Sequence, residues 1–171
     1  MINISNAVLS KKAVAIIIKT AKDGYLAPYK QERLGILLGR LQGDTVFVSN
    51  GILFQGGIKT RTSVSVNSRS IENRIEHLSL RHRLKFLGSF HTHNEVANNI
   101  SSALSEEDKV PICENYIPLI EVVATIWVSD SPLRQSQYYC QVRCDEYRIR
   151  IATYRFGGSF PIMPVSSKGF K

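Results

Sequence analysis

Residues 88–108, which read GSFHTHNEVANNISSALSEED, bring two histidines and several carboxylates close together in sequence, and we expect the rest of the chain to be the scaffold that presents them. His91 and His93 lie one residue apart in a segment that we predict to be a strand, so both imidazoles should point to the same face. The same alternation puts Leu87 and Ser89 on that face and leaves three residues on the other, namely Phe86, Gly88 and Phe90. Because imidazole is a preferred zinc ligand, this spacing predicts that both side chains can reach one metal ion.

Polar residues at the end of this stretch allow two compatible interpretations. Ser105 and Asp108 fit a capping arrangement, in which a serine precedes a helix and an acidic residue occupies its third position. Asp108 is also a candidate metal ligand, which a helix start would hold in place beside the positive end of its dipole. We expect residues 105–116 to be helical at their start, with a kink or an early end at Pro111.

Glu32 precedes a continuously apolar run, residues 34–38, which is the pattern of a strand buried on both faces. Taken alone, Glu32 is best interpreted as an exposed charge in a loop. A carboxylate at the edge of such a strand can also project into a cleft. This second role requires that the strand lies beside the strand of His91 and His93.

Patterns of both helices and strands indicate one α/β domain with a central mixed β-sheet flanked by helices. One helix should start after Ser10 as its N-cap and stop near Gly24, and another should cover residues 71–83 with Ser68 or Ser70 as its cap. The predicted strands cover residues 1–9, 34–38, 46–54, 62–66, 84–93, 121–128, 137–143 and 147–156, the last two as a hairpin.

The domain is expected to comprise residues 1–156, followed by a loosely held tail rich in Gly, Pro and Ser at residues 157–171. His77 and His82 fall in the second predicted helix. We interpret His77 as a surface residue and His82 as a helix-end residue that favours the C-terminal dipole, rather than as metal ligands.

Composition limits the class of protein and its partners. The 171 residues include 22 Lys and Arg against 14 Asp and Glu, a net charge of +8, which suggests an acidic partner such as nucleic acid, an anionic membrane or an acidic protein. The basic residues form no stripe or known motif, which argues against nucleic acid. Three cysteines without CxxC spacing indicate a reducing compartment, and no run of 18 apolar residues or signal-peptide layout occurs. We therefore expect a soluble cytoplasmic protein that does not enter a membrane.

The separated polar residues together resemble the signature of the JAMM (MPN+) zinc metalloprotease family. That signature has a Glu before a Gly- and Leu-containing strand, then H-[ST]-H, then S-x-x-D. Here the corresponding residues are Glu32 before GILLG at 35–39, then His91-Thr92-His93, then Ser105 and Asp108. The resemblance covers roughly residues 1–130 and implies a single JAB/MPN-like domain with cytidine-deaminase-like layering.

The spacing within the signature differs from the usual one. The family commonly has a proline after the second His and seven residues between that His and the Ser, whereas here Asn94 follows and eleven residues intervene. Ser101 would match the usual spacing, but Leu104 three residues later cannot bind a metal. We therefore assign Ser105 and Asp108 to the S-x-x-D part of the signature, after a loop that is four residues longer than the usual one.

The resemblance implies a zinc hydrolase. His91, His93 and Asp108 would hold zinc and leave a fourth position for water, which attacks as zinc hydroxide. Glu32 would act as general base and then acid, and Ser105 would stabilise the oxyanion. Thr92 is predicted to face away from the ligands and to be structural.

Family members commonly cleave peptide or isopeptide bonds after the C-terminal tail of ubiquitin or a ubiquitin-like modifier, so such a modifier or its conjugates are the expected partner. The alternative is a non-catalytic scaffold or binding module of the MPN fold. Such relatives typically lose one or more of the Glu, His and Asp positions, all of which are present here. Whether the chain acts alone, as a homo-oligomer or in a larger complex is left open by the sequence.

Overall fold

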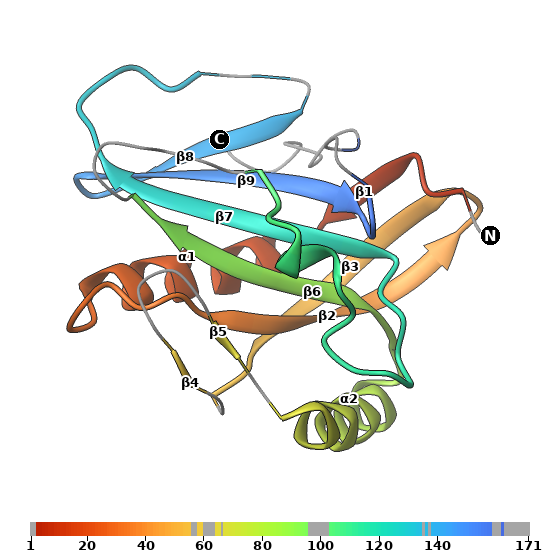
Figure 1. Cartoon of the computed structure of the whole chain (residues 1–171). Coiled ribbons are helices and arrows are strands. Elements are labelled where there is room, and N and C mark those ends of the chain that lie inside the picture. Colours follow the sequence, from red (N-terminus) through yellow and green to blue (C-terminus); the bar gives the residue numbers. More distant parts are fainter. Residues whose placement is uncertain are drawn as a thin grey trace.

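The computed structural model describes residues 3–55, 58–59, 64–65, 67–95, 103–134, 136, 138–158 and 162. The elements in chain order are β1 (Asn6–Leu9), α1 (Lys11–Leu26), β2 (Leu34–Gln42), β3 (Thr45–Leu53), β4 (Ile58–Lys59), β5 (Val64–Ser65), α2 (Ser68–His82), β6 (Lys85–Asn94), the 3-10 helix η1 (Glu107–Lys109), β7 (Ile120–Val128), β8 (Tyr139–Cys144) and β9 (Tyr147–Arg155). Among the described residues, seven strands form one curled sheet in the order β1-β3-β2-β6-β7-β9-β8 (Figure 1). The sheet is mixed, as expected, because β1–β3 and β6–β7 are parallel pairs and the other pairs are antiparallel.

Helix α1 covers one face of the sheet. Its N-cap is Ser10, as predicted, and the Ser10 side chain accepts a hydrogen bond from the Ala13 backbone N–H at 3.1 Å. Val14 and Ile17 are fully buried and belong to a core that includes Phe90 of β6. The helix extends two residues beyond the predicted stop and ends at Leu26.

Helix α2 packs on the opposite face. Ile71, Ile75 and Leu78 line its buried side and form a second core with Ile36 of β2, whereas the adjacent Leu37 points into the α1 core. The predicted cap was wrong. Asn67 caps this helix by accepting a hydrogen bond from a backbone N–H at 3.1 Å, and asparagine is at least as good an N-cap as the two serines that follow.

The central strands of the sheet lie where the sequence predicts them. The run predicted at residues 34–38 lies in β2 and is entirely buried, and β7 is buried from residue 120 to 127. The C-terminal hairpin is also confirmed, since β8 and β9 pair antiparallel. Cys140 and Cys144 lie in β8, and like Cys113 they are free.

A β-bulge in β6 corrects the predicted alternation of faces. Leu37 of β2 pairs with Gly88, but Leu38 pairs with Phe86, so Leu87 is an extra residue on the β6 side. Leu87 therefore points into the α1 core together with Phe90, and Phe86 packs against the α2 core. The prediction that Leu87 shares a face with His91 was wrong because a period of two cannot register an inserted residue.

The segment after β6 is less helical than predicted. Instead of a helix starting at residue 105, the described residues there contain only η1, and Pro111 follows it closely. A proline lacks the backbone N–H that a continuing helix needs. The loop at 96–102, most of the strand predicted at 62–66 and most of the tail at 157–171 lie outside the described residues. No helix in the described ranges is long and apolar enough to cross a membrane.

Candidate metal centre

Two histidines of β6 lie side by side on the sheet face opposite α1. The Nε2 atoms of His91 and His93 are 3.0 Å apart, and their ring centroids are 4.7 Å apart. His91 is buried, with 4 % of its surface exposed, and His93 is half-buried. The predicted alternation thus brings both imidazoles to one place, and the bulge at residues 87–88 decides which face that is.

Asp108 of η1 completes a cluster with the two histidines. Its Oδ1 lies 3.4 Å from Nε2 of His91, and one ligand atom from each of the three side chains lies within 4.8 Å of the others. Two ligands of one tetrahedral zinc ion are separated by roughly 3.3 Å when each is about 2.0–2.1 Å from the metal. The eleven residues between His93 and Ser105 therefore do not prevent Asp108 from reaching the imidazoles.

Ser105 fixes Asp108. The backbone N–H and the hydroxyl of Ser105 both donate to Oδ2 of Asp108 at 2.7 Å, and the Asp108 backbone N–H donates to the Ser105 Oγ at 3.3 Å. This is the predicted capping arrangement, although it caps a 3-10 turn rather than a full helix. It leaves Oδ1 facing the imidazoles. It also directs the Ser105 hydroxyl hydrogen at Asp108.

Glu32 lies beside this cluster because β2 pairs with β6. Leu34 is the register partner of His91, and Glu32 comes two residues earlier. The connection is held at Arg33, whose N–H donates to the Thr92 Oγ1 and whose carbonyl accepts from the Thr92 N–H, both at 2.9 Å. Thr92 is fully buried and faces away from the cluster, as predicted for a structural residue.

The environment of Glu32 raises its pKa from an ordinary value of 4.5 to about 7. Burial is the main cause, because a desolvated carboxylate is disfavoured, and the positive charge of His91 partly opposes it while the negative charge of Asp108 adds to it. The side chain is 8 % exposed, so the interpretation as an exposed loop charge was wrong. A carboxyl with this pKa can exchange protons at neutral pH.

Glu121 of β7 is a participant that the sequence reasoning missed. Its Oε1 lies 2.7 Å from Nδ1 of His91, and its Oε2 accepts a hydrogen bond from the Ser89 hydroxyl at 2.5 Å. Glu121 is 4 % exposed, and its strand runs parallel to β6 with Ser89 as its register partner. A carboxylate at this position keeps the hydrogen on Nδ1 and leaves Nε2 of His91 free to bind a metal.

The pKa of His91 shows how these carboxylates act on it. Burial alone would lower the pKa, but the hydrogen bond and charge of Glu121, with Asp108 and Glu32, raise it above the ordinary value of 6.5. The signal for Glu121 in the sequence is that it is the one charged residue in a largely apolar run, EVVATIWV at 121–128. It becomes meaningful only once β7 is known to lie beside β6.

His77 and His82 do not belong to the cluster of His91, His93 and Asp108. His77 is exposed on α2, and His82 is the last residue of that helix. Both placements agree with the sequence-based interpretation.

The pKa of Asp108 lies below its ordinary value. Burial alone would raise it, but the charge of His91 and the hydrogen bonds from Ser105 outweigh this effect.

Comparisons with known proteins give a likeness of fold. No family model matches the sequence, and no curated protein matches it. The solution structure of protein DSY2949 from Desulfitobacterium hafniense is similar, with a TM-score of 0.53 and 20% sequence identity over 70% of this chain and 74% of that one. At this identity the likeness concerns the fold alone. The chain is thus a mixed α/β protein with a curled seven-stranded sheet and two helices in its described part.

Proposed function

We propose that the chain is a zinc-dependent hydrolase of peptide or isopeptide bonds, of the JAMM type, with a JAB/MPN-like arrangement of layers. The observation that carries the proposal is the cluster of His91, His93 and Asp108, whose ligand atoms lie within 4.8 Å of one another beside the buried carboxyl of Glu32. A mixed sheet with α1 on one face and α2 on the other agrees with that layering. The free cysteines agree with a cytoplasmic location.

The donor set fits zinc. Two imidazole nitrogens and one carboxylate oxygen are a ligand set of hydrolytic zinc sites, which keep another position open. His91 has its Nδ1 at the Glu121 carboxylate, so its Nε2 would be the ligand atom together with a nitrogen of His93 and Oδ1 of Asp108. Zinc, when bound there, would supply the Lewis acidity that lowers the pKa of water and polarises a carbonyl group.

Glu32 is the candidate general base and acid. In its carboxylate form it would take a proton from the attacking water, and as the acid it would return that proton to the leaving amine. The pKa of about 7 supports both roles near neutral pH, and the positive charge of a metal nearby would favour the carboxylate. The hydrogen bonds between Arg33 and Thr92 hold the backbone next to Glu32 against β6.

Ser105 is the candidate oxyanion donor. Its hydroxyl would have to turn from Asp108 Oδ2 to the developing negative charge, and such a donor contributes roughly 3–4 kcal/mol. The Ser105 backbone N–H would still hold Oδ2 at 2.7 Å, so the ligand carboxylate would keep its orientation. One residue can thus position the metal ligand through its backbone and assist the reaction through its side chain.

The substrate class that we propose is the C-terminal tail of a ubiquitin-like modifier, or a conjugate of it. The resemblance of Glu32, the His91–His93 pair, Ser105 and Asp108 to the JAMM signature supports this class. Such tails bind in an extended form, in which backbone hydrogen bonds supply affinity without requiring particular side chains.

The test is metal analysis combined with cleavage of a modifier-linked substrate. Wild type and Glu32→Gln should each retain about one zinc per chain, and only wild type should cleave, because the variant keeps the ligands but lacks the base. Glu106→Gln is the matched control, since Glu106 is exposed and its carboxylate pairs with Lys109 rather than with the cluster. It should retain both zinc and activity. Protein without zinc that does not cleave would contradict the proposal and favour the non-catalytic scaffold.

A further inference from the structure

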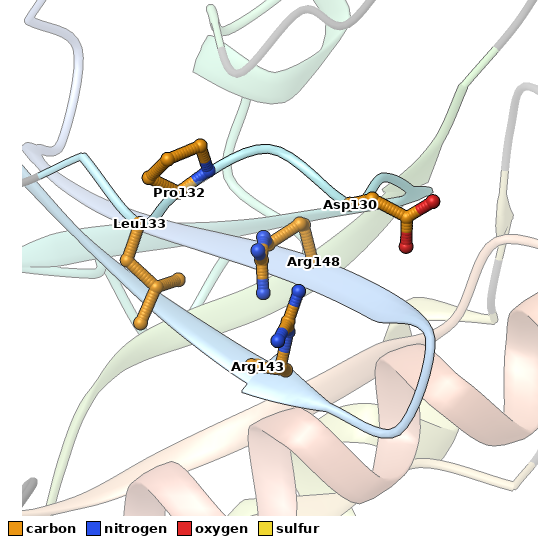
Figure 2. Close-up of a pocket in the computed structure, with 5 residues that line it drawn as sticks. All are labelled: Asp130, Pro132, Leu133, Arg143 and Arg148. Atoms are coloured by element: carbon orange, nitrogen blue, oxygen red, sulfur yellow. The ribbon is translucent and has the colours of Figure 1, made fainter.

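A small pocket lies between the β8–β9 hairpin and the segment that follows β7. Its volume is about 280 Å³, and it is lined by Asp130, Pro132, Leu133, Arg143 and Arg148. Figure 2 shows the guanidinium groups of both arginines next to each other in this space, with the Asp130 carboxylate to one side. The candidate metal centre uses none of these residues.

Arg148, which lines this pocket, has a side-chain donor without a hydrogen-bond partner. The residue is only 3 % exposed, and its Nη2 donates a hydrogen bond to the Ser131 carbonyl oxygen. Its Nη1 is buried and has no hydrogen-bond partner. A buried cationic donor without a partner is costly, so the position favours an anion that would complete its hydrogen bonds.

Arg143 adds a second positive charge from the neighbouring strand. It is the direct register partner of Arg148 in the hairpin. Within the described ranges, no carboxylate oxygen forms an ion pair with either guanidinium group. Two like charges placed opposite each other in a sheet destabilise it unless an anion lies between them.

The pocket faces the same side of the sheet as the metal centre. Tyr147 and Ile149 point into the α1 core, so Arg148 between them points to the other face. The same face of β9 carries Ala152 and Tyr154, which pack on Val123, and Val123 is the register partner of His91. Both sites therefore open on one surface.

The register gives their separation. His93 pairs with Thr125 of β7, and Trp127 two residues further along pairs with Arg148 of β9. With strands about 4.8 Å apart and about 3.3 Å per residue, the Cα atoms of His93 and Arg148 are separated by roughly 12 Å. An extended polypeptide covers this distance in about four residues.

Arg150 lies between the two sites. It is the register partner of Thr125, and its guanidinium group lies 5.4 Å from the ring centroid of Trp127 and 4.7 Å from that of Tyr139. Its Nε is buried without a hydrogen-bond partner. Arg150 thus adds a third positive charge between the metal centre and the arginines of the pocket, and it would attract an acidic chain lying there.

We propose that the pocket of Arg143 and Arg148 binds the carboxylate of an acidic side chain in the substrate, about four residues from the bond that is cleaved. This assignment of the pocket to the substrate rests on the proposed hydrolase function. Arginine guanidinium groups match a carboxylate in planar geometry, and Pro132 and Leu133 provide apolar walls for the methylene groups of a Glu side chain.

Binding is tested apart from hydrolysis. A short Gly/Ser peptide with one Glu, and its Gln counterpart, are titrated into the chain in EDTA while the arginine side-chain signals are followed by NMR. The Glu peptide should shift the signals of Arg143 and Arg148, and the Gln peptide should not. Arg143→Gln should weaken binding at least tenfold, whereas Arg81→Gln, an exposed arginine on α2, should not. Arg148→Lys is a second variant for the same titration, which keeps the positive charge of residue 148 but removes the planar guanidinium group. Equal effects of the two peptides would overturn the pocket assignment, and so would a preference for single-stranded DNA over the Glu peptide.

The position of the acidic residue is tested with the zinc-loaded chain. Quenched peptides carry one Glu at two, four or six residues from a Gly–Gly bond. The peptide with four residues should have the lowest KM. Arg143→Gln should abolish this preference, whereas Arg81→Gln should keep it. Equal KM values for the three peptides would overturn the assigned position. Intact Glu binding without any cleavage would instead overturn the hydrolase and the link of the pocket to its substrate.

Discussion

At the scale of single residues, Glu121 acts on the metal centre through His91. Its carboxylate keeps the imidazole hydrogen on Nδ1 and makes Nε2 a better ligand. Replacement by Gln removes the charge. It also places an amide N–H donor where Oε2 of Glu121 accepts the hydrogen bond of the Ser89 hydroxyl in wild type. We predict that Glu121→Gln lowers zinc affinity by about 10–100-fold, measured by competition with a chromophoric chelator.

Glu106→Gln is again the control for this measurement, because it removes an exposed carboxylate near Asp108 without touching His91. It should bind zinc like wild type. Equal zinc affinities of the Glu121→Gln variant and wild type would mean that the hydrogen bond at 2.7 Å orients His91 without affecting metal binding.

Glu32 makes the stability of the metal-free chain depend on pH. Its pKa is about 7 when folded and near the ordinary 4.5 when unfolded. Below pH 4.5 both states hold the proton, and as the pH rises from 4.5 through 7 the unfolded state releases it first, so the folded state loses stability. Glu32→Gln lacks this loss. We therefore predict that the free energy of unfolding of the variant, minus that of wild type, increases by an amount on the order of 3 kcal/mol between pH 4.5 and pH 8.

The measurement is urea unfolding of both chains in EDTA across this pH range. His91 and Asp108 titrate in both chains, so their contributions largely cancel in the difference. A difference that stays flat from pH 4.5 to 8 would show that the carboxyl of Glu32 is solvated in the folded chain.

At the scale of elements, the bulge in β6 depends on Gly88. This residue has a φ of +155°, and an added Cβ would lie 1.8 Å from the Ile120 carbonyl oxygen on the neighbouring strand. We predict that Gly88→Ala destabilises the fold by roughly 3 kcal/mol or more in urea unfolding, because backbone atoms would have to move. Gly43→Ala is the control, since its φ is +63° but nothing lies within 4 Å, and it should cost only about 1 kcal/mol.

The individual elements show what sequence patterns can predict. The apolar run at 34–38 and the cap at Ser10 depend on local physics, and both were correct. The bulge at Leu87 was missed. Gly88 is an isolated glycine in a strand, which is a common sign of a bulge or of a close backbone approach, but the sequence does not show which of the two applies or which neighbour is the inserted residue. The helix expected after Ser105 is reduced to η1, which ends at Lys109, and Pro111 lacks the backbone N–H that a longer helix would need.

At the scale of the whole molecule, the candidate site depends on pairings between distant segments. The two histidines and Asp108 were identifiable by residue type. They lie close together in the structure although the segment between His93 and Ser105 is longer than in the JAMM signature. The burial of Glu32 depends on β2 pairing with β6, and the role of Glu121 depends on β7 lying on the other side of β6. A single sequence does not encode strand order in a local pattern. For this reason the sequence left two interpretations of Glu32 open, and Glu121 was missed.

Zinc should stabilise the whole fold if the cluster binds it. An ion that binds the folded chain but not the unfolded one adds about 2.7 kcal/mol at a free concentration 100 times its Kd, which for a domain of this size raises Tm by roughly 5–10 °C. We predict this increase when zinc is added to the chelated chain, measured by thermal unfolding. Asp108→Asn should lose most of the increase, because Oδ1 of Asp108 faces the imidazoles. His77→Asn should keep it, because His77 is exposed on α2. An equal increase in both variants would place the stabilising zinc elsewhere and separate the cluster from metal binding.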